Sequence, residues 1–271
     1  MVCLSLLPGH LRGAGQPAFN QPYQPATNIQ QDNRAPGPAL SPSPAKPPEE
    51  TPGAQLKPND SAPLVRLISP GLFEVGSVRL DKQHHTVSFP AVLNSSSGPM
   101  EYFVVTSYGK VHESILKTEA SPYHIHIAML LLGAKGDEGG PAARSGVRPS
   151  LGPIKNPSKE IVPGDRVSVW LAWKDHGAEV RHPAEELVFN QKTHSTLDPE
   201  SWVYNGSCVL DGRFLAQSEG SIVSLVTDPI ALVNNLAPGH DNDQIWTAAT
   251  NNLPPANVSL EVQIKLPDSL P

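Results

Sequence analysis

The distribution of proline most constrains what this chain can fold into. Nearly half of its 30 prolines lie before Leu72, and residues 16–63 consist mainly of Pro, Ala, Gln, Asn and Ser. Such a segment has too little apolar surface to offset the entropy lost on ordering, and closely spaced prolines favour an extended chain. We therefore predict a disordered Pro-rich stalk over residues 16–63 and one folded domain over residues 64–267.

Two further segments differ from the domain in composition. Residues 134–164 are rich in Gly and Pro and too long for an ordinary connection, which predicts a flexible excursion. Residues 1–15 join a short apolar stretch to small residues, as a leader remnant does, although a basic first region is missing. A leader followed by a stalk favours an extracytoplasmic location, periplasmic or in the cell envelope. A cytoplasmic chain with a disordered tail is the alternative.

Charge and hydropathy exclude several partners. The net charge is −6 and there is no basic stripe, which argues against nucleic acid. The longest apolar run, Ile127 to Leu132, is far shorter than the roughly 20 residues of a transmembrane helix. The two cysteines, Cys3 and Cys208, cannot supply the about four thiolates of an iron–sulfur cluster. The partner is then an envelope protein or a small ligand whose identity the sequence does not give.

From Leu64 onward, short β-prone runs alternate with turn residues. The runs "EYFVVTS", "RVSVWLAW" and "VSLEVQIKL" are rich in β-branched and aromatic residues. A turn at Tyr108-Gly109 would return "KVHESILK" beside "EYFVVTS", and Asp175-His176-Gly177 is a second hairpin signal. This pattern predicts a mainly β (α+β) domain, built as an antiparallel β-sandwich or a barrel.

Two short helices interrupt this β pattern. Ser121 and Asp228 are each followed by proline. A Ser or Asp side chain caps a helix start, and proline suits the first helical position, where its missing N–H costs little. We predict helices at about 122–133 and 229–236.

The stretch "KVHES" sets Lys110, His112, Glu113 and Ser114 side by side between two apolar runs. On a strand, alternate side chains share a face, so Lys110, His112 and Ser114 would point the same way. His112 and Ser114 would be a base and a hydroxyl, and with Glu113 they are the candidate catalytic residues. A triad would need a carboxylate from elsewhere in the fold. Ordinary surface polarity or a structural hydrogen-bond network is the alternative.

A metal site is a further hypothesis for the same region. His124 stands at the start of the predicted helix, and a tight link would bring it near His112. His112, Glu113 and His124 would suit zinc or copper, whereas capping or packing is the other role for a histidine there. Asp243 joins Lys110, His112 and His124 as a candidate ligand-binding residue. No GxGxxG, Walker, GxSxG or HExxH motif occurs.

Several segments together resemble the YdjY-type domain. They are "GKVHESIL", "SPYHIHIAMLLLGAK", "VSVWLAW" and "SIVSLVTDPIALVNN", with the late pair Asn242-Asp243, and the similarity covers about Leu72 to Leu266. The resemblance implies an exported protein, often behind a signal or lipoprotein leader, of unestablished molecular function. It maps the family's His-Glu-Ser onto residues 112–114 and its Thr-Asp-Pro onto residues 227–229, without a role for either. The ferredoxin-like label of some members conflicts with the cysteine count.

Three function hypotheses follow. The first is an exported binding or accessory domain, not an enzyme, tethered by the stalk. The second is an extracytoplasmic metal-dependent or acid–base enzyme centred on His112 and Glu113. The third is a structural envelope protein. The first two need residues 110–118 extended beside the helix that begins after Ser121, so that imidazoles from both elements meet.

Overall fold

The computed structural model of the protein describes residues 64–137 and 162–268. The predicted leader over 1–15, the stalk over 16–63 and most of the excursion over 134–164 lie outside these ranges. Within the two described ranges, no helix has both the length and the apolar character needed to cross a membrane.

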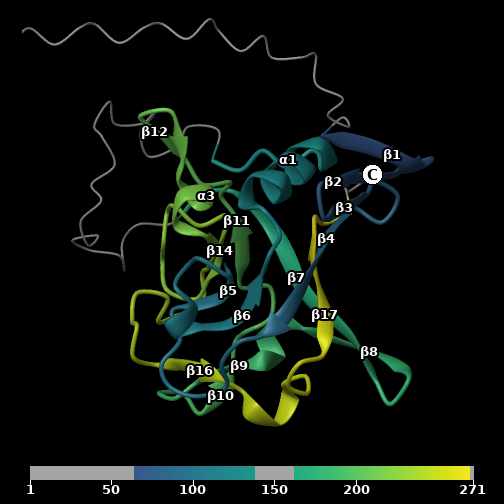
Figure 1. Ribbon diagram of the computed structural model, residues 1–271. Coiled ribbons are helices and arrows are strands. Elements are labelled where there is room, and N and C mark those ends of the chain that lie inside the picture. Colours follow the sequence, from purple (N-terminus) through teal and green to yellow (C-terminus); the bar gives the residue numbers. More distant parts are fainter. Residues whose placement is uncertain (1–63, 138–161, 269–271) are drawn as a thin grey trace, which may run out of the picture. The chain divides into compact units, whose positions relative to one another are not determined.

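Eight strands form a closed β-barrel (Figure 1). In order around the barrel they are β4 (Thr86–Leu93), β17 (Ser259–Lys265), β7 (Asp165–Asp175), β11 (Trp202–Tyr204), β15 (Val233–Asn235), β14 (Ser221–Ser224), β5 (Tyr102–Thr106) and β6 (Ser114–Thr118). Val92 lies opposite Lys117 and Leu93 opposite Leu116, and this short β4–β6 pairing closes the ring. The mainly β, barrel-like fold predicted from the sequence is confirmed.

Smaller elements extend the barrel wall and cover its ends. The strands β1 (Val65–Ser69), β2 (Leu72–Val75) and β3 (Val78–Asp81) continue the sheet from β4 as a meander, and β8 (Ala178–Pro183) pairs with β7. The remaining elements are β9 (Val188–Asn190), β10 (Ser195–Thr196), β16 (Trp246–Ala248), β12 (Val209–Leu210), β13 (Arg213–Phe214), η1 (Val111–Glu113), η3 (Ala184–Leu187), η4 (Thr250–Asn252), α1 (Pro122–Leu132) and α3 (Leu215–Glu219).

The core follows from strict alternation along the long strands. On β17, Leu260, Val262 and Ile264 are buried while the residues between them are not. β4 and β7 send Val, Phe, Leu and Trp side chains to the same interior. Each fully buried large apolar side chain stabilises the fold by about 1.5–3 kcal/mol. The opposite face of these strands is left free for polar side chains.

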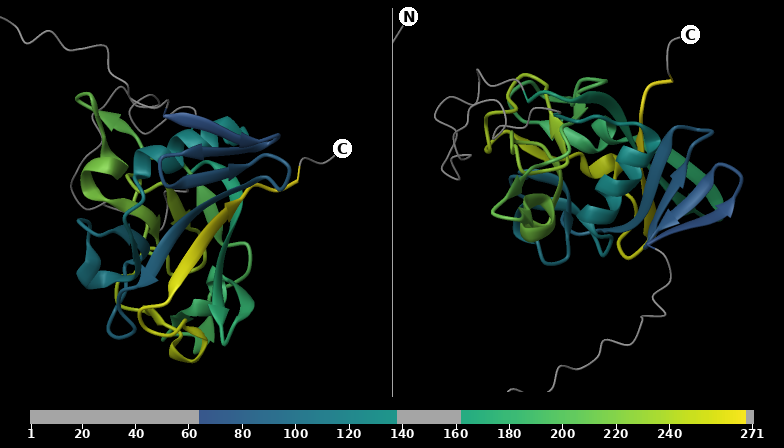
Figure 2. Two further views of the ribbon diagram at one scale, coloured as in Figure 1. Left: turned by 45° about the vertical axis from the view of Figure 1, so that its right-hand side comes forward. Right: turned by 90° about the horizontal axis from the view of Figure 1, so that it is seen from above.

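The helix α1 begins and ends as the sequence predicts. The Ser121 side chain accepts a hydrogen bond from the His124 backbone N–H, and Pro122 occupies the first helical position. Gly133 ends the helix with a positive φ of 105°, a conformation that costs glycine little. α1 packs on the inner face of β2, β3 and β4, as Figure 2 shows, and buries Ile125 and Met129 there.

The predicted helix at 229–236 is wrong. A turn occupies its start, and Val233–Asn235 form strand β15, paired with β11 and β14. Asn234 explains the difference, because its side chain accepts from the Asp228 N–H at 2.7 Å and donates to the Asp228 carbonyl at 2.9 Å. These local bonds satisfy the backbone in place of helical ones. The second helix is instead α3, just before β14.

The predicted pairing of the "KVHESILK" segment is partly wrong. Ser114–Thr118 do form the strand next to β5, but the two strands run parallel rather than as a hairpin. Residues 107–113 carry the chain back along β5, and Val111–Glu113 form the 3₁₀ turn η1. The condition that residues 110–118 are extended therefore holds only from Ser114 onward.

Candidate functional site

The predicted polar residues gather at the end of the barrel where β5 and β6 begin. Glu101, directly before β5, anchors this end through its backbone. Its N–H donates to the Glu113 carbonyl at 2.9 Å, and its carbonyl accepts from the Leu225 N–H at 2.8 Å. Three segments distant in sequence are thereby held together. We call Glu101, Lys110, His112, Glu113 and Asp243 the Glu101 cluster.

The other four side chains lie close enough to Glu101 for their charges to act on its carboxyl. Burial raises the pKa of the Glu101 carboxyl, and the negative charge of Glu113 raises it further, with a smaller contribution from Asp243. Lys110 and His112 act in the opposite direction. Of the four candidate ligand-binding residues, Lys110, His112 and Asp243 are therefore brought together around one carboxylate, and His124 is not among them.

A chain of hydrogen bonds lies beneath this cluster. Lys110 Nζ donates to the Tyr102 hydroxyl at 2.6 Å, and the hydroxyl donates to Asp228 Oδ2 at 2.8 Å. The Lys110 ammonium also lies 4.8 Å from the centre of the Tyr102 ring, a cation–π distance. Burial and the neighbouring Asp228 charge raise the pKa of Tyr102, so its hydroxyl stays protonated and fixes the lysine.

Asp228 is a buried anchor rather than a helix cap. Burial raises the pKa of its carboxyl, and the bonds from Tyr102 and from the Ile230 N–H, at 3.1 Å, oppose that shift. The Ser221 hydroxyl, wholly inaccessible to solvent, lies beside both Tyr102 and Asp228. The segment at 227–229 thus positions Lys110 through Tyr102.

The candidate catalytic pair does not form. His112 lies in η1 with 77% of its side chain exposed, and its Nε2 is 3.5 Å from Glu113 Oε2. Ser114 is fully buried, and its hydroxyl accepts from Asn94 Nδ2 at 3.2 Å. The expectation that His112 and Ser114 share one strand face fails because the strand begins only at Ser114.

The structure also does not unite the predicted metal ligands. His124 projects from α1 against the β2–β3 turn, where its ring lies directly over Gly76. Over residues 64–137 and 162–268, no group of three or more His, Cys, Asp or Glu side chains is arranged to hold a metal ion. A zinc or copper site made of His112, Glu113 and His124 has no support in this geometry, since His124 packs elsewhere.

Sequence reasoning missed Glu101 and Tyr102 and misread Asp228. Glu101 and Tyr102 stand in the run "EYFVVTS", whose composition predicts only a strand. A signal for this site does exist in the sequence. Glu101 is a charged residue at the start of an otherwise apolar strand, beside the hydroxyl of Tyr102, and the β pattern gives no reason for a charge there. The pairing with Asp228 spans 126 residues, a separation that local patterns do not reveal.

Fold and site define a class of β-barrel domain with a polar, loop-borne cluster at one end. The model of the YdjY domain matches residues 78–265, and the chain belongs to this family. The resemblance noted in the sequence is thereby confirmed. Neither the curated proteins nor the solved structures contain a match.

Proposed function

We propose that the protein is a binding or accessory domain whose ligand contacts the Glu101 cluster. The carrying observation is that the charges of Glu113 and Asp243 act on the Glu101 carboxyl, while the Lys110 ammonium already donates to Tyr102, which donates to Asp228. The cluster contains three carboxyl groups and one lysine ammonium, so its side chains favour a positively charged partner. An organic cation, such as a primary amine, is the ligand class that this charge favours.

Geometry supports binding more than catalysis. A nucleophile needs a base within about 3 Å, and the only hydroxyl proposed for this role, Ser114, is buried away from His112. One observation favours the enzyme alternative: Glu101 has a raised pKa beside Glu113, and a carboxyl pair with unlike environments can act as acid and base. If an enzymatic activity were detected, its loss in Glu101→Gln with ligand binding retained would favour that alternative.

The proposal also includes export of the protein from the cytoplasm. The Pro-rich composition of residues 16–63 and the family resemblance support an extracytoplasmic module on a stalk. A cytoplasmic location and a purely structural envelope role are the alternatives. Cell fractionation of the full chain decides the location, with recovery in the cytosolic fraction counting against export.

A thermal-shift screen of the untagged full chain tests the binding site. Putrescine, spermidine and arginine methyl ester are the probes, with succinate as the opposite charge. A ligand at 100 times its Kd stabilises by about 2.7 kcal/mol, which raises Tm by about 5–10 °C for a domain of this size. We expect Asp243→Asn and Glu113→Gln to abolish the shift and Asp241→Asn, a neighbouring exposed acid, to retain it. An equal loss in Asp241→Asn would contradict the assignment.

A further inference from the structure

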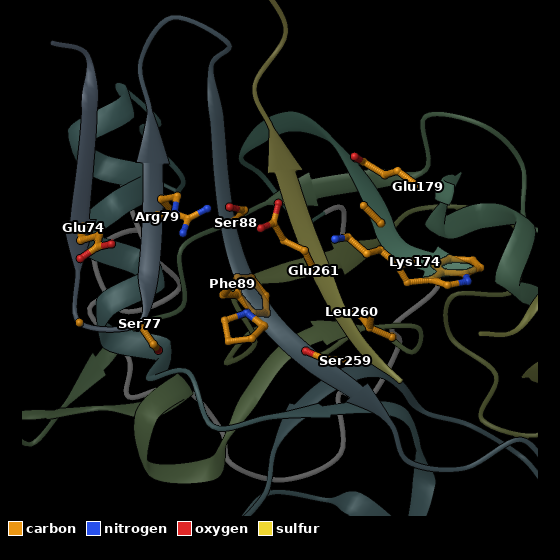
Figure 3. Close-up of a pocket in the computed structure, with 14 residues that line it drawn as sticks. Glu74, Ser77, Arg79, Ser88, Phe89, Lys174, Glu179, Ser259, Leu260 and Glu261 are labelled. Carbon is orange, nitrogen blue, oxygen red and sulfur yellow. The ribbon is translucent and has the colours of Figure 1, made fainter. Parts of the chain in front are cut away.

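The two faces of the sheet that extends the barrel wall differ in character. On the outer face, a groove of about 580 Å³ crosses the strands (Figure 3). Glu74 lies opposite Arg79 and Lys174 lies opposite Glu179 along it, so opposite charges neighbour one another there. The inner face is apolar, and α1 covers it mainly over β2, β3 and β4. Apolar surface left uncovered is therefore to be sought beside α1.

α1 leaves its own outer side uncovered. Residues at positions i, i+4, i+7 and i+8 share one side of a helix, and in α1 these are Tyr123, Ile127, Leu130 and Leu131. The exposed fractions are 47% for Tyr123, 47% for Leu130 and 41% for Leu131. α1 contains no acidic residue, no lysine and no arginine. A helix that is apolar all round is usually buried on every side, whereas this one is buried on one side only.

Two neighbouring elements continue this apolar side. The Tyr123 ring meets Phe214 edge to face, with 6.0 Å between the ring centres, and Phe214 lies opposite Val209, which is 60% exposed. On β1, Leu67 lies opposite Phe73 and is 62% exposed. β12, α1 and β1 share one end of the molecule in Figure 1, and Figure 2 also places β1 beside α1. We call the α1 surface the exposed residues Leu67, Tyr123, Leu130, Leu131 and Val209.

The shape of the α1 surface favours a lipid bilayer over a protein partner. α1 is a ridge about 16 Å long, which offers much less than the roughly 800 Å² that each partner contributes to a stable protein interface. A fluid bilayer needs no complementary shape, because it takes up apolar side chains wherever they project. Leucine side chains suit its hydrocarbon, and Tyr123 suits the boundary with water, where an aromatic ring with a polar tip is favoured.

The charges at the border and the position of Leu64 agree with this choice. Lys135 and Arg213 are exposed beside the α1 surface, and Asp137 and Asp211 bring the opposite sign. Apolar contact rather than charge therefore carries the binding. The first described residue, Leu64, is 46% exposed directly before β1, so the 63 residues that precede it join the domain at this end. A tether held at a membrane would not have to cross the domain to bring this end to the bilayer.

We propose that the α1 surface inserts into the interface of a lipid bilayer and holds the domain on the membrane. Leu130 and Leu131 enter furthest, because they project from the outer side of the ridge. Leu67 and Val209 follow on either side of it. The α1 surface shares no residue with the Glu101 cluster, so this proposal does not depend on the proposed function.

Co-sedimentation of the full chain with phosphatidylcholine vesicles tests the proposal. We expect the wild type to bind and Leu130→Ser with Leu131→Ser to lower the partition constant about tenfold, because two apolar side chains no longer leave water. Leu130→Met with Leu131→Met is the matched control, since it keeps the surface apolar and should keep the binding. Both positions are exposed, so Tm should stay nearly the same in the two double variants.

Four results would overturn the proposal. The first is no co-sedimentation of the wild type at about 1 mM lipid, where a partition constant of about 10³ M⁻¹ would leave half of the protein bound. The second is equal binding of the Ser and Met variants. The third is binding only to vesicles that contain phosphatidylglycerol, which would assign it to charge. The fourth is self-association of the wild type that the Ser variant loses in analytical ultracentrifugation, which would make the α1 surface an interface between copies.

A further variant separates this proposal from the proposed function. Asp243→Asn, which should abolish amine binding at the Glu101 cluster, should leave vesicle binding unchanged. Failure of the one site and failure of the other are therefore distinct results.

Discussion

At the scale of single residues, Glu101 carries the clearest pH dependence. Its pKa is raised in the folded state, so folding disfavours its ionised form, and stability falls as the pH rises through that pKa. Glu101→Gln should therefore be more stable than the wild type at pH 7, by less than about 1 kcal/mol because solvent screens this half-exposed site. The difference should vanish below about pH 4, under the usual Glu pKa. Urea unfolding across this range measures it, and Glu119→Gln, an exposed acid, should show no such trend.

Tyr102 provides a second test at this scale. Tyr102→Phe removes the hydroxyl between Lys110 and the buried Asp228 carboxylate, which leaves a buried acceptor without its donor. We expect a loss of about 1–3 kcal/mol in the free energy of unfolding. The hydroxyl of Tyr108 also has two partners, both on Gln217, but this side chain is 57% exposed. Tyr108→Phe is thus the matched control and should cost clearly less; equal losses would mean that Asp228 does not need this donor.

At the scale of elements, the β2–β3 turn and α1 pack so closely that there is no space for a methyl group at Gly76. A Cβ at Gly76 would lie 2.2 Å from His124 Nδ1, and this glycine has a φ of +61°. Gly76→Ala should therefore destabilise by more than about 2 kcal/mol, combining backbone strain with overpacking. Gly71→Ala, at φ +81° with open space around it, isolates the strain alone, at about 1 kcal/mol.

The double variant Gly76→Ala with His124→Ala checks the cause, because removing the ring makes room for the methyl group. It should recover part of the stability in thermal unfolding. If the double variant lost the sum of both single effects, the contact between turn and helix would not be the source.

How far sequence reasoning reached also depends on the element. The limits of α1 were predictable, because Ser121, Pro122 and Gly133 act through local bonds. The corresponding Asp-Pro pair at Asp228 led to the wrong prediction of a helix, because Tyr102 and Asn234 supply the hydrogen-bond partners of Asp228 from other strands. The Glu101 cluster was half predictable for this reason: its residues are visible as polar interruptions, whereas their convergence is set by the topology of the barrel.

At the scale of the whole molecule, closure of the barrel rests on a short seam. β4 and β6 share only two residue pairs, and Asn94 reinforces them by donating to the carbonyls of Val111 and Ser114. Asn94→Ala should speed hydrogen exchange of the seam amides more than that of β7 and β17, because it releases the seam locally before global unfolding. Uniform acceleration in all strands would show that the seam opens only with the whole fold, and Asn242→Ala in a surface loop is the control.

The position of β17 has a consequence for how the protein is made. β17 lies between β4 and β7 and pairs with both. These two strands can therefore form that pairing only when residues 259–265 have been synthesised. A nascent chain on the ribosome holds β4 and β7 with nothing between them, and pairings so distant in sequence form slowly. We therefore expect the barrel to close only after residues 259–265 have emerged from the ribosome, so a chain that lacks this strand should leave one edge of β4 and one edge of β7 unpaired.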